Sequence, residues 1–363
     1  MGDLAQCYSD RVSISVHVIY EHGGDARPFS PAHIRLLGPL SHPSVKDEIA
    51  LSIGTEYRPA DVVIIERLLN RDVSFQAVDI LLSQVRRDGV CLVYETDDDF
   101  IHCGPYAHLG YRDLLAQKCL AMQLARECNG VITSTERLKA ALAAFNDRII
   151  VVPNAIDERL YDAKHSPSPP DRNVIGYMGT LTHERDLELI LKPLRTAAMS
   201  SQFELELVGG VLETQARSMF WRFPMRVLDV GPNTEYPSFI SWMQRELHWD
   251  LAVAPLEDTE FNASKSDIKF LDYSAFGIPA IYSKVPAYSA TVKHMETGYL
   301  AANTTVDWAE ALSFMLNNAQ RRREMAFAAK EYVTQHRTLE HAAYLWVDAI
   351  RAILNCGTGV QRV

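Results

Sequence analysis

Two lysines and a carboxylate recur at helical spacing within residues 262–282, which read NASKSDIKFLDYSAFGIPAIY. Lys265 and Lys269 are four residues apart and Asp272 follows after three, so a single helix would place them on one face. Open amides at the start of a helix carry about half a positive charge, which suits a phosphate oxygen. The segment therefore predicts a cationic helix start that grips a diphosphate. The alternative is a solvated face that only keeps the helix soluble.

The ends of this helix are also marked. Ser264 and Ser266 are candidate N-caps, because a serine oxygen accepts hydrogen bonds from the first helical amides. Gly277 ends the helix, and Pro279 keeps it from resuming. The apolar residues 280–282 that follow predict a short strand buried on both faces.

Three consecutive aspartates, Asp97, Asp98 and Asp99, follow an apolar segment that ends at Glu95. Adjacent carboxylates repel one another, so one of them can hold a raised pKa suited to proton transfer. We expect them to bind or activate a hydroxyl group at the end of a strand. An N-cap and turn is the structural alternative, and a metal site is the third.

Several glycines and one histidine follow predicted strands. Glycine lets backbone approach a ligand closely but also serves in ordinary turns, and both interpretations stay open here. His183 precedes a predicted helix, where it either contacts a ligand or satisfies a local hydrogen bond. The other candidates are Gly23, Gly24, Gly209, Gly231 and Asn233.

Strand-like and helix-like segments alternate along the chain, which predicts parallel sheets covered by helices. In the first half we expect strands at 12–20, 62–66, 90–95, 130–134 and 148–152, with helices at 31–40, 75–87 and 110–128. The pattern restarts with strands at 174–178, 204–208, 226–230 and 251–255 and helices at 186–198, 236–245, 308–317, 321–336 and 339–354. The predicted fold class is α/β, with two Rossmann-like, doubly wound domains that face a cleft.

The domain boundaries follow from this alternation. We expect an N-terminal domain over residues 1–157, a proline-rich linker over 158–172 and a C-terminal domain over 173–338. The last segment, 339–363, is expected to form a helix that crosses back to the N-terminal domain. Ligands bind beyond the carboxyl ends of strands in such sheets, so the site is expected between the two domains.

Composition limits the classes of function. The chain has 363 residues, of which 47% are hydrophobic, enough for two cores. A formal net charge of −10 argues against nucleic acid or anionic membrane as a general partner and favours a small anionic ligand. Six cysteines without a C-x-x-C pair suit an intracellular protein with reduced thiols. We expect no secretion signal and no transmembrane segment, because no apolar run approaches ~20 residues.

With these features, the chain resembles GT-B glycosyltransferases, most of all the large retaining family 4, over nearly its whole length. Residues 153–157, PNAID, resemble the junction between the two domains of that family, with Ala155 in place of glycine. The Asn-x-x-Lys-Ser opening at Asn262, the Thr-x-x-His turn and the aspartates at 97–99 resemble a subgroup of bacterial polysaccharide and O-antigen enzymes.

This resemblance implies roles for individual residues. In family 4 the first of two spaced glutamates contacts the donor sugar and the second the ribose; Ser264 stands at the first position and Asp272 at the second. Thr180 replaces the arginine of a diphosphate clamp, and Arg185 lies close to its lysine position, so Lys265 and Lys269 would supply the missing charge. The implied catalytic residues are Asp97, Asp98, Asp99 and His183. The implied donor-binding residues are Gly23, Gly24, Thr180, Arg185, Gly209, Gly231, Asn233, Ser264, Lys265, Ser266, Lys269 and Asp272.

The function expected from the resemblance is transfer of a sugar from a nucleotide diphosphate donor to a saccharide or glycoconjugate hydroxyl. We expect it to act in the cytoplasm, in polysaccharide assembly, without a metal or another cofactor; peripheral membrane contact stays open. Retention of configuration is the family expectation. The alternatives are a nucleotide-sugar epimerase on the same fold, a metal-dependent phosphohydrolase centred on Asp97–Asp99, and an inactive nucleotide-binding partner.

Overall fold

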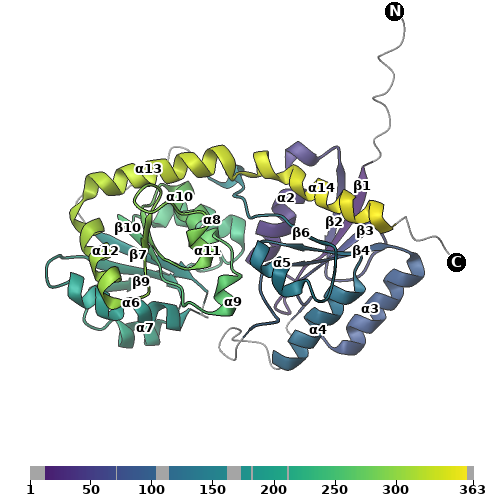
Figure 1. Ribbon diagram of the computed structural model, residues 1–363, viewed down its shortest axis with the longest axis horizontal. Coiled ribbons are helices and arrows are strands. Elements are labelled where there is room, and N and C mark those ends of the chain that lie inside the picture. The colour runs from purple at the N-terminus through teal and green to yellow at the C-terminus, as the bar shows by residue number, and fades with distance from the viewer. Residues whose placement is uncertain are drawn as a thin grey trace, which may run out of the picture.

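The computed structural model describes residues 13–70, 72–103, 114–161, 173–180, 183–210 and 212–357. Two parallel six-stranded sheets form two domains that lie side by side (Figure 1). This arrangement confirms the predicted α/β fold with two doubly wound sheets. Most of the linker expected over 158–172 lies outside the described residues.

The first sheet has the strand order β2-β1-β3-β4-β5-β6. Its central strands are buried along their whole length, as expected for apolar runs covered on both faces. Its strands are β1 (Ile14–Ile19), β2 (Ile49–Gly54), β3 (Val62–Glu66), β4 (Cys91–Thr96), β5 (Gly130–Thr133) and β6 (Ile149–Val151). Its helical segments are α1 (Ser30–Ala32), η1 (His33–Leu37), α2 (Gly38–Leu40), η2 (Pro43–Val45), α3 (Phe75–Asp88), α4 (Leu114–Glu127) and α5 (Glu136–Leu142).

The second sheet has the order β12-β11-β10-β7-β8-β9. Its strands are β7 (Val174–Gly179), β8 (Glu204–Gly209), β9 (Met225–Val227), β10 (Leu251–Ala254), β11 (Ala280–Ser283) and β12 (Tyr299–Ala301). Its helices are α6 (Glu184–Ala197), α7 (Glu213–Met219), α8 (Tyr236–Glu246), α9 (Glu260–Ala263), α10 (Ile268–Phe276), α11 (Pro286–Ser289), α12 (Thr305–Asn317) and α13 (Ala319–His336). A short helix η3 (Glu158–Leu160) follows the first domain.

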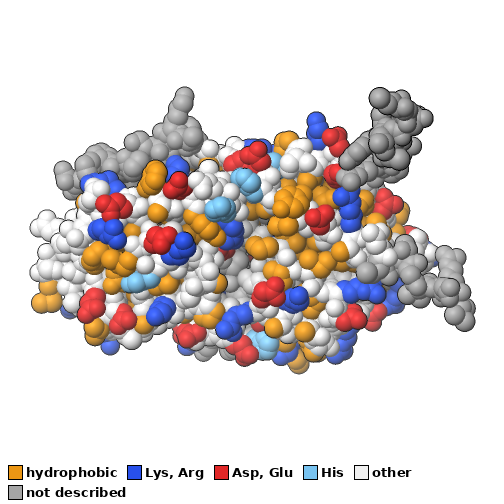
Figure 2. Space-filling view, turned by 45° about the horizontal axis from the view of Figure 1, so that its top comes forward, with side chains coloured by type: hydrophobic (Ala, Val, Ile, Leu, Met, Phe, Trp, Pro, Cys, Tyr) orange, Lys and Arg blue, Asp and Glu red, His pale blue; other side chains and the backbone are white. Residues whose placement is uncertain are grey.

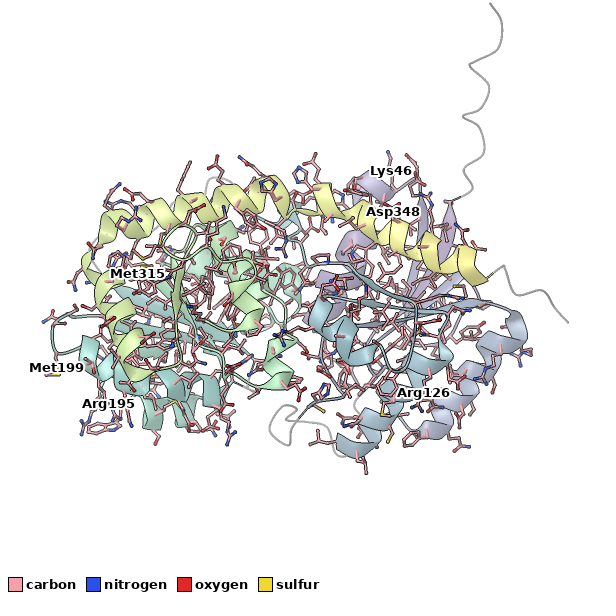
Figure 3. All side chains as sticks on the ribbon, viewed as in Figure 1. Lys46, Arg126, Arg195, Met199, Met315 and Asp348 are labelled. Atoms are coloured by element: carbon pink, nitrogen blue, oxygen red, sulfur yellow. The ribbon has the colours of Figure 1, made fainter. Side chains whose placement is uncertain are left out.

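Alternate strand residues feed separate cores on the two faces of each sheet. In β3, Val63 and Ile65 pack in one cluster with α3 and α4, whereas Val62 and Ile64 pack in another with α14 (Leu339–Gly357). The second sheet is covered by α8, α10 and α13 on one face and by α6 and α12 on the other. Side chains fill the interior of both domains (Figure 3). In the second domain, Met315 is fully buried, whereas Met199 is exposed at the end far from the first domain.

Helix α14 lies across the first domain although it follows the second in sequence (Figure 1). Trp346 and Ile350 are buried against Val16 and Leu36. A Cβ on Gly130 would stand 2.7 Å from the Ile353 side chain, so helix and sheet approach closely there. The C-terminal helix therefore completes the core of the N-terminal domain.

Several local predictions were wrong. The edge strands β2 and β12 were not anticipated, because strands that are largely exposed or half-buried carry little apolar pattern. The strand expected at 226–230 is the shorter β9. The segment at 262–276 is not one helix: α9 ends at Ala263 and α10 starts at Ile268.

On the face of the molecule that Figure 2 shows, acidic and basic side chains are interspersed rather than gathered by sign, as expected for a chain that carries many residues of both signs. Within the described part of the chain, no helix is both long and apolar enough to cross a membrane.

Candidate donor and acceptor sites

In the second sheet, the direction in which successive strands are added reverses between β7 and β10. From β7 the chain proceeds to β8 on one side, while β10 and β11 lie on the other. Ligands of doubly wound sheets bind beyond the carboxyl ends of the strands at such a point. Three loops lie at this point, namely those that follow β7, β8 and β10. We call these loops, together with Lys269, the β7/β10 switch point.

Glycines allow the loops of this switch point to lie close together. The Gly210 amide donates to the Gly179 carbonyl over 2.7 Å. Gly209 has a φ of +65°, and a Cβ there would stand 2.1 Å from the Gly179 carbonyl oxygen. Gly210 has a φ of +84°, and its Cβ would stand 2.6 Å from the Tyr177 ring. Glycine is therefore required at Gly209 and Gly210 by the packing of the loops themselves.

A histidine and an aspartate are paired at the start of α6. His183 Nδ1 lies 2.6 Å from Asp186 Oδ2, and the Glu257 amide donates to Asp186 Oδ1 over 2.7 Å. Burial, assisted by the charge of Lys269, lowers the pKa of His183 to about 4. Burial opposes ionisation of Asp186, but the hydrogen bond from His183 and the contact from Glu257 hold its pKa below the usual value. At neutral pH the pair is thus an uncharged imidazole beside a carboxylate.

Lys269 adds a positive charge at this switch point. Its side chain is buried in α10, with Nζ 5.1 Å from the centroid of the Tyr177 ring. Burial lowers its pKa to about 8, although Asp186 partly opposes that shift. The amine is therefore mostly protonated at pH 7.

Lys265 does not share a face with Lys269, contrary to the prediction. It lies between α9 and α10, and its Nζ is 3.2 Å from Asp98 Oδ1 in the first domain. The Phe261 ring lies 4.6 Å from the same Nζ. The two lysines therefore serve different neighbours.

The predicted serine caps are also wrong. Thr259 caps α9, whereas Asp267, the N-cap residue of α10, forms no capping hydrogen bond with its side chain. Ser264 and Ser266 instead contact the first domain. The Ser264 hydroxyl donates to Asp99 Oδ2 over 3.1 Å, and the Ser266 hydroxyl accepts from the Asn154 amide over 2.8 Å.

Asp272 is held by two tyrosines. Its Oδ1 accepts from the Tyr161 hydroxyl over 2.8 Å and from the Tyr236 hydroxyl over 2.7 Å. Burial raises the pKa of Asp272 to about 6, although these two hydrogen bonds oppose the shift. A cavity of about 400 Å³ between the domains adjoins Tyr236, but none of the predicted donor-binding residues lines it.

The three aspartates lie at the carboxyl end of β4, where they meet Arg67. The Arg67 guanidinium donates to Asp98 over 2.5 Å and lies 3.5 Å from Asp97. Asp99 accepts from the His102 backbone and lies 2.8 Å from its ring nitrogen. Burial raises the pKa of Asp97, and the Arg67 charge opposes this shift. We call Arg67, Asp97, Asp98, Asp99 and Lys265 the acidic cluster.

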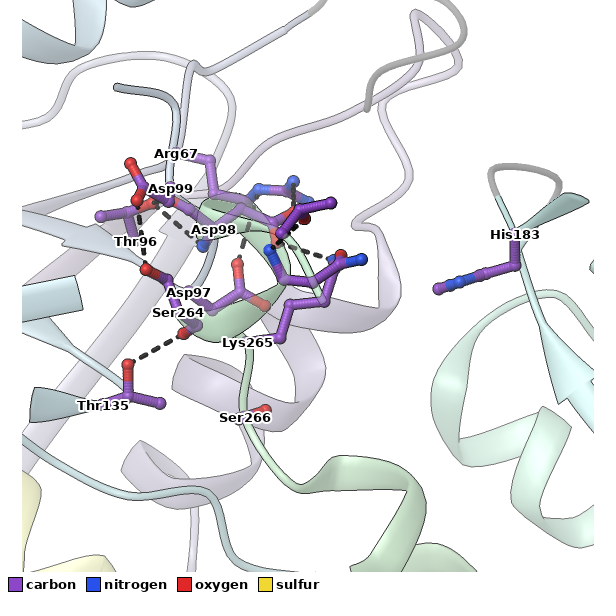
Figure 4. A network of polar contacts seen from close by, with 12 residues as sticks. Arg67, Thr96, Asp97, Asp98, Asp99, Thr135, His183, Ser264, Lys265 and Ser266 are labelled. Atoms are coloured by element: carbon purple, nitrogen blue, oxygen red, sulfur yellow. Dashed lines mark hydrogen bonds and ion pairs between the residues drawn. The ribbon is translucent and has the colours of Figure 1, made fainter. Parts of the chain in front are cut away.

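Figure 4 shows the acidic cluster with Ser264 and Thr135 around it. The Thr135 hydroxyl donates to the Ser264 carbonyl over 2.9 Å, which adds a further contact between the domains. His183 stands apart from this cluster, with its ring directed toward it (Figure 4). The contacts thus bring the end of β4 against the chain between α9 and α10, on the side that His183 faces.

The remaining predicted residues are more exposed. Thr180 and Arg185 lie on the surface near His183, and Arg185 is 3.9 Å from Glu257. Gly23 and Gly24 belong to an exposed loop after β1. Gly231 is exposed in the turn after β9, where the Asn233 side chain donates to the Val230 carbonyl over 2.9 Å.

Sequence reasoning missed Arg67 and Asp186. Arg67 directly follows a strand that was predicted correctly, and it has a φ of +51°, which is rare outside glycine. Asp186 lies three residues after His183, one helical turn away, a spacing that brings side chains together. Among the described residues, no group of three or more histidine, cysteine, aspartate or glutamate side chains is arranged to hold a metal ion.

Comparisons with known proteins support the two-domain fold described above. Residues 159–332 match the model of the family described as glycosyl transferases group 1. None of the curated proteins is significantly similar in sequence. Anabaena HepE, solved in complex with UDP-glucose, has a TM-score of 0.66 at 13% identity, covering 93% of this chain and 100% of that chain.

Two further structures have the same architecture. A glycosyltransferase from Rickettsia africae has a TM-score of 0.62 at 10% identity, covering 94% of this chain and 99% of that chain. Sucrose-phosphate synthase from Thermosynechococcus elongatus has a TM-score of 0.61 at 15% identity, covering 82% and 74%. These similarities show that the chain has the two-domain GT-B fold, and the stretch that matches group 1 glycosyl transferases lies mostly in its second domain. Neither finding supports the epimerase or the phosphohydrolase alternative.

Proposed function

We propose that this glycosyltransferase moves a sugar from a nucleotide diphosphate donor to a hydroxyl of a saccharide or glycoconjugate. One observation carries the proposal. The stretch that matches group 1 glycosyl transferases, 159–332, contains the β7/β10 switch point, where Lys269 supplies a buried positive charge. HepE, of similar fold, is described as a complex with UDP-glucose, so UDP-sugars are the first donors to test.

The donor diphosphate is proposed to lie beside Lys269 and the loops at Gly179 and Gly210. A leaving nucleotide diphosphate gains negative charge as the bond to the sugar breaks, and a fixed cation stabilises that charge. Thr180 and Arg185 lie at the outer side of this position. Lys265 reaches the diphosphate only by leaving Asp98, whose Oδ1 lies 3.2 Å from the lysine Nζ.

The ribose is proposed to bind Asp272 through its second carboxylate oxygen. Oδ1 already accepts from Tyr161 and Tyr236, whereas Oδ2 has no hydrogen bond among the described residues. The turn with Gly231 and Asn233 is proposed to contact the base. Ser264 and Ser266 would border the sugar from the side of the first domain.

The acceptor hydroxyl is proposed to bind the acidic cluster. Asp97 is the carboxylate best suited to take a proton, because burial raises its pKa. The loop at Gly23 and Gly24, which also follows a strand of the first sheet, would contact the acceptor or the donor phosphates. His183 completes the catalytic set.

Finer assignments belong to this proposal as well. The similarity of the PNAID junction and the Lys/Asp segment to family 4 supports membership there, retention of configuration, a role in polysaccharide assembly, action in the cytoplasm and catalysis without a metal. Ser264 in place of the first glutamate makes the stereochemical outcome the first of these to measure.

The test begins with donor binding. Thermal shifts with UDP, GDP, ADP and their sugars should identify one base, and transfer should then be measured on saccharide acceptors. Lys269→Met should lower kcat/KM by ~10²-fold, the loss typical of removing one charge-stabilising group. Lys192→Met, an exposed lysine on α6, is the matched control. Binding of no nucleotide, or turnover of the donor into another sugar without an acceptor, would contradict the proposal.

A further inference from the structure

The Asp186 carboxylate receives two hydrogen bonds from fixed donors. The Glu257 amide, which follows β10, donates to Oδ1 over 2.7 Å. The His183 ring nitrogen Nδ1 lies 2.6 Å from Oδ2. Because an ionised carboxylate only accepts hydrogen bonds, Nδ1 must carry the proton in this pair. The aspartate therefore fixes both the orientation of the imidazole and its tautomer.

The other ring nitrogen, Nε2, is left with a lone pair. The ring lies edge-on to Tyr177, with 6.4 Å between the ring centroids, and points toward the acidic cluster (Figure 4). Among the described residues, Nε2 has no hydrogen-bond partner. The nearby charge of Lys269 and burial both disfavour a second proton, which keeps the pKa of the ring at about 4.

A group that meets Nε2 must then donate a hydrogen bond. Phosphate oxygens accept, and Lys269 already offers them a cation, whereas the hydroxyl groups of a sugar donate. We propose that Asp186 is a positioning residue that holds His183 with Nε2 as the acceptor for one hydroxyl of the donor sugar. This inference rests on the proposed function and adds to it the direction of one contact with the sugar.

Replacing Asp186 by asparagine gives a sharp test, because the site can satisfy an amide in only one orientation. The Glu257 amide needs an acceptor, so the asparagine oxygen must face it. The NH2 group then faces His183 and donates to Nδ1, which moves the proton to Nε2. Asp186→Asn thus changes the tautomer while it keeps the shape of the side chain.

The tautomer is read from the nitrogen-15 shifts of the His183 ring, assigned by comparison with His183→Gln. We expect a protonated Nδ1 and an unprotonated Nε2 in the wild type at pH 7, and the reverse in Asp186→Asn. Glu188→Gln, an exposed carboxylate on the same helix, is the control and should leave the shifts unchanged. An imidazolium, or an unprotonated Nδ1, in the wild type would overturn the inference.

Kinetics with monodeoxy donors tests the contact itself. Removing one sugar hydroxyl should lower the wild-type kcat/KM by ~10–100-fold, the cost of an unmade buried hydrogen bond. In Asp186→Asn the protonated Nε2 can meet the same hydroxyl only as a donor, so the loss caused by this deoxygenation should differ from that of the wild type, which a purely structural defect would not produce. Equal sensitivity of both proteins to every deoxy donor would refute the proposal.

The outcomes separate this inference from the proposed function. A wild type that binds no nucleotide sugar refutes the function, while the NMR spectrum still decides the tautomer. If Asp186→Asn does not fold, the wild-type spectrum and the wild-type deoxy series decide the inference by themselves. A wild type that loses less than threefold with every deoxy donor overturns it.

Discussion

Lys269 illustrates how one residue combines a structural cost with a function. Its amine is buried in α10 above the Tyr177 ring, where the charged form is less stable than in water. A neutral residue would be easier to bury there. The charge is retained beside Asp186, at the position where the proposed diphosphate would restore the lost solvation.

The pH dependence of the reaction tests this role. The pKa of Lys269 is lowered to about 8 by burial, so the free enzyme loses the cation as the pH rises through that value. We expect kcat/KM to decrease as the pH rises above about 8, because only the protonated amine stabilises the leaving diphosphate. In Lys269→Arg this decrease should move to a pH above the measurable range, because the guanidinium stays charged.

The contribution of Lys269 to the free energy of unfolding should change with pH in the opposite direction. The folded pKa of Lys269 lies below its usual value of 10.5, so the unfolded chain binds more protons between these two values. The contribution of this group to the free energy of unfolding therefore increases with pH in that window. A wild-type kcat/KM that stays flat through pH 9 would show that the protonated Lys269 is not required.

At the scale of the elements, the loops after β7 and β8 approach each other through glycine. Gly210 and Gly231 both have positive φ, +84° and +55°, but their surroundings differ. A Cβ on Gly210 would collide with Tyr177, whereas a Cβ on Gly231 would meet nothing within 4 Å. Substituting each of these two glycines by alanine therefore separates the cost of backbone strain from the cost of steric contact.

Gly231→Ala should cost only the left-handed conformation, ~1–2 kcal/mol of the free energy of unfolding. Gly210→Ala should cost more, because the new methyl group must also displace the Tyr177 ring beside Lys269. Urea unfolding of the two variants measures this difference. Equal losses would mean that the loops adjust without moving the tyrosine.

At the scale of the molecule, the two domains are joined by the bend between α13 and α14. Arg337 in this bend forms two hydrogen bonds with Asp267, of 2.9 and 3.0 Å, and donates to the Asn154 carbonyl. The same side chain thus contacts the junction after the first domain and the start of α10. Helix α14 continues from there into the core of the first domain.

Trp346 on α14 is buried, and the Arg35 guanidinium lies 4.8 Å from the centroid of its ring. Trp346→Ala should lower the free energy of unfolding by ~3–5 kcal/mol through the cavity it leaves. Hydrogen exchange should accelerate in β1 and β3 while β7 and β8 stay protected. Tyr344→Ala, whose side chain is 54% exposed, is the control on the same helix. Faster exchange in both sheets would show that the domains unfold as one unit.

Much of the architecture could be predicted from local patterns. Apolar runs such as 62–66 and 90–95 form buried parallel strands, because few other structures bury both faces of so short a segment. The segment at 262–276 was harder. Its lysine spacing fits one helix, yet Ser264 and Ser266 make contacts across the domain boundary that interrupt it.

Local sequence patterns are enough to predict the two α/β domains and the polar residues that follow their strands, because periodicity and turn residues act over a few positions. Which of these residues contact one another depends on the tertiary fold. Lys265 pairs with Asp98 across 167 positions, and Asp186 holds both His183 and the amide of Glu257. Such contacts depend on how two sheets face each other and how their loops converge, which no local spacing encodes.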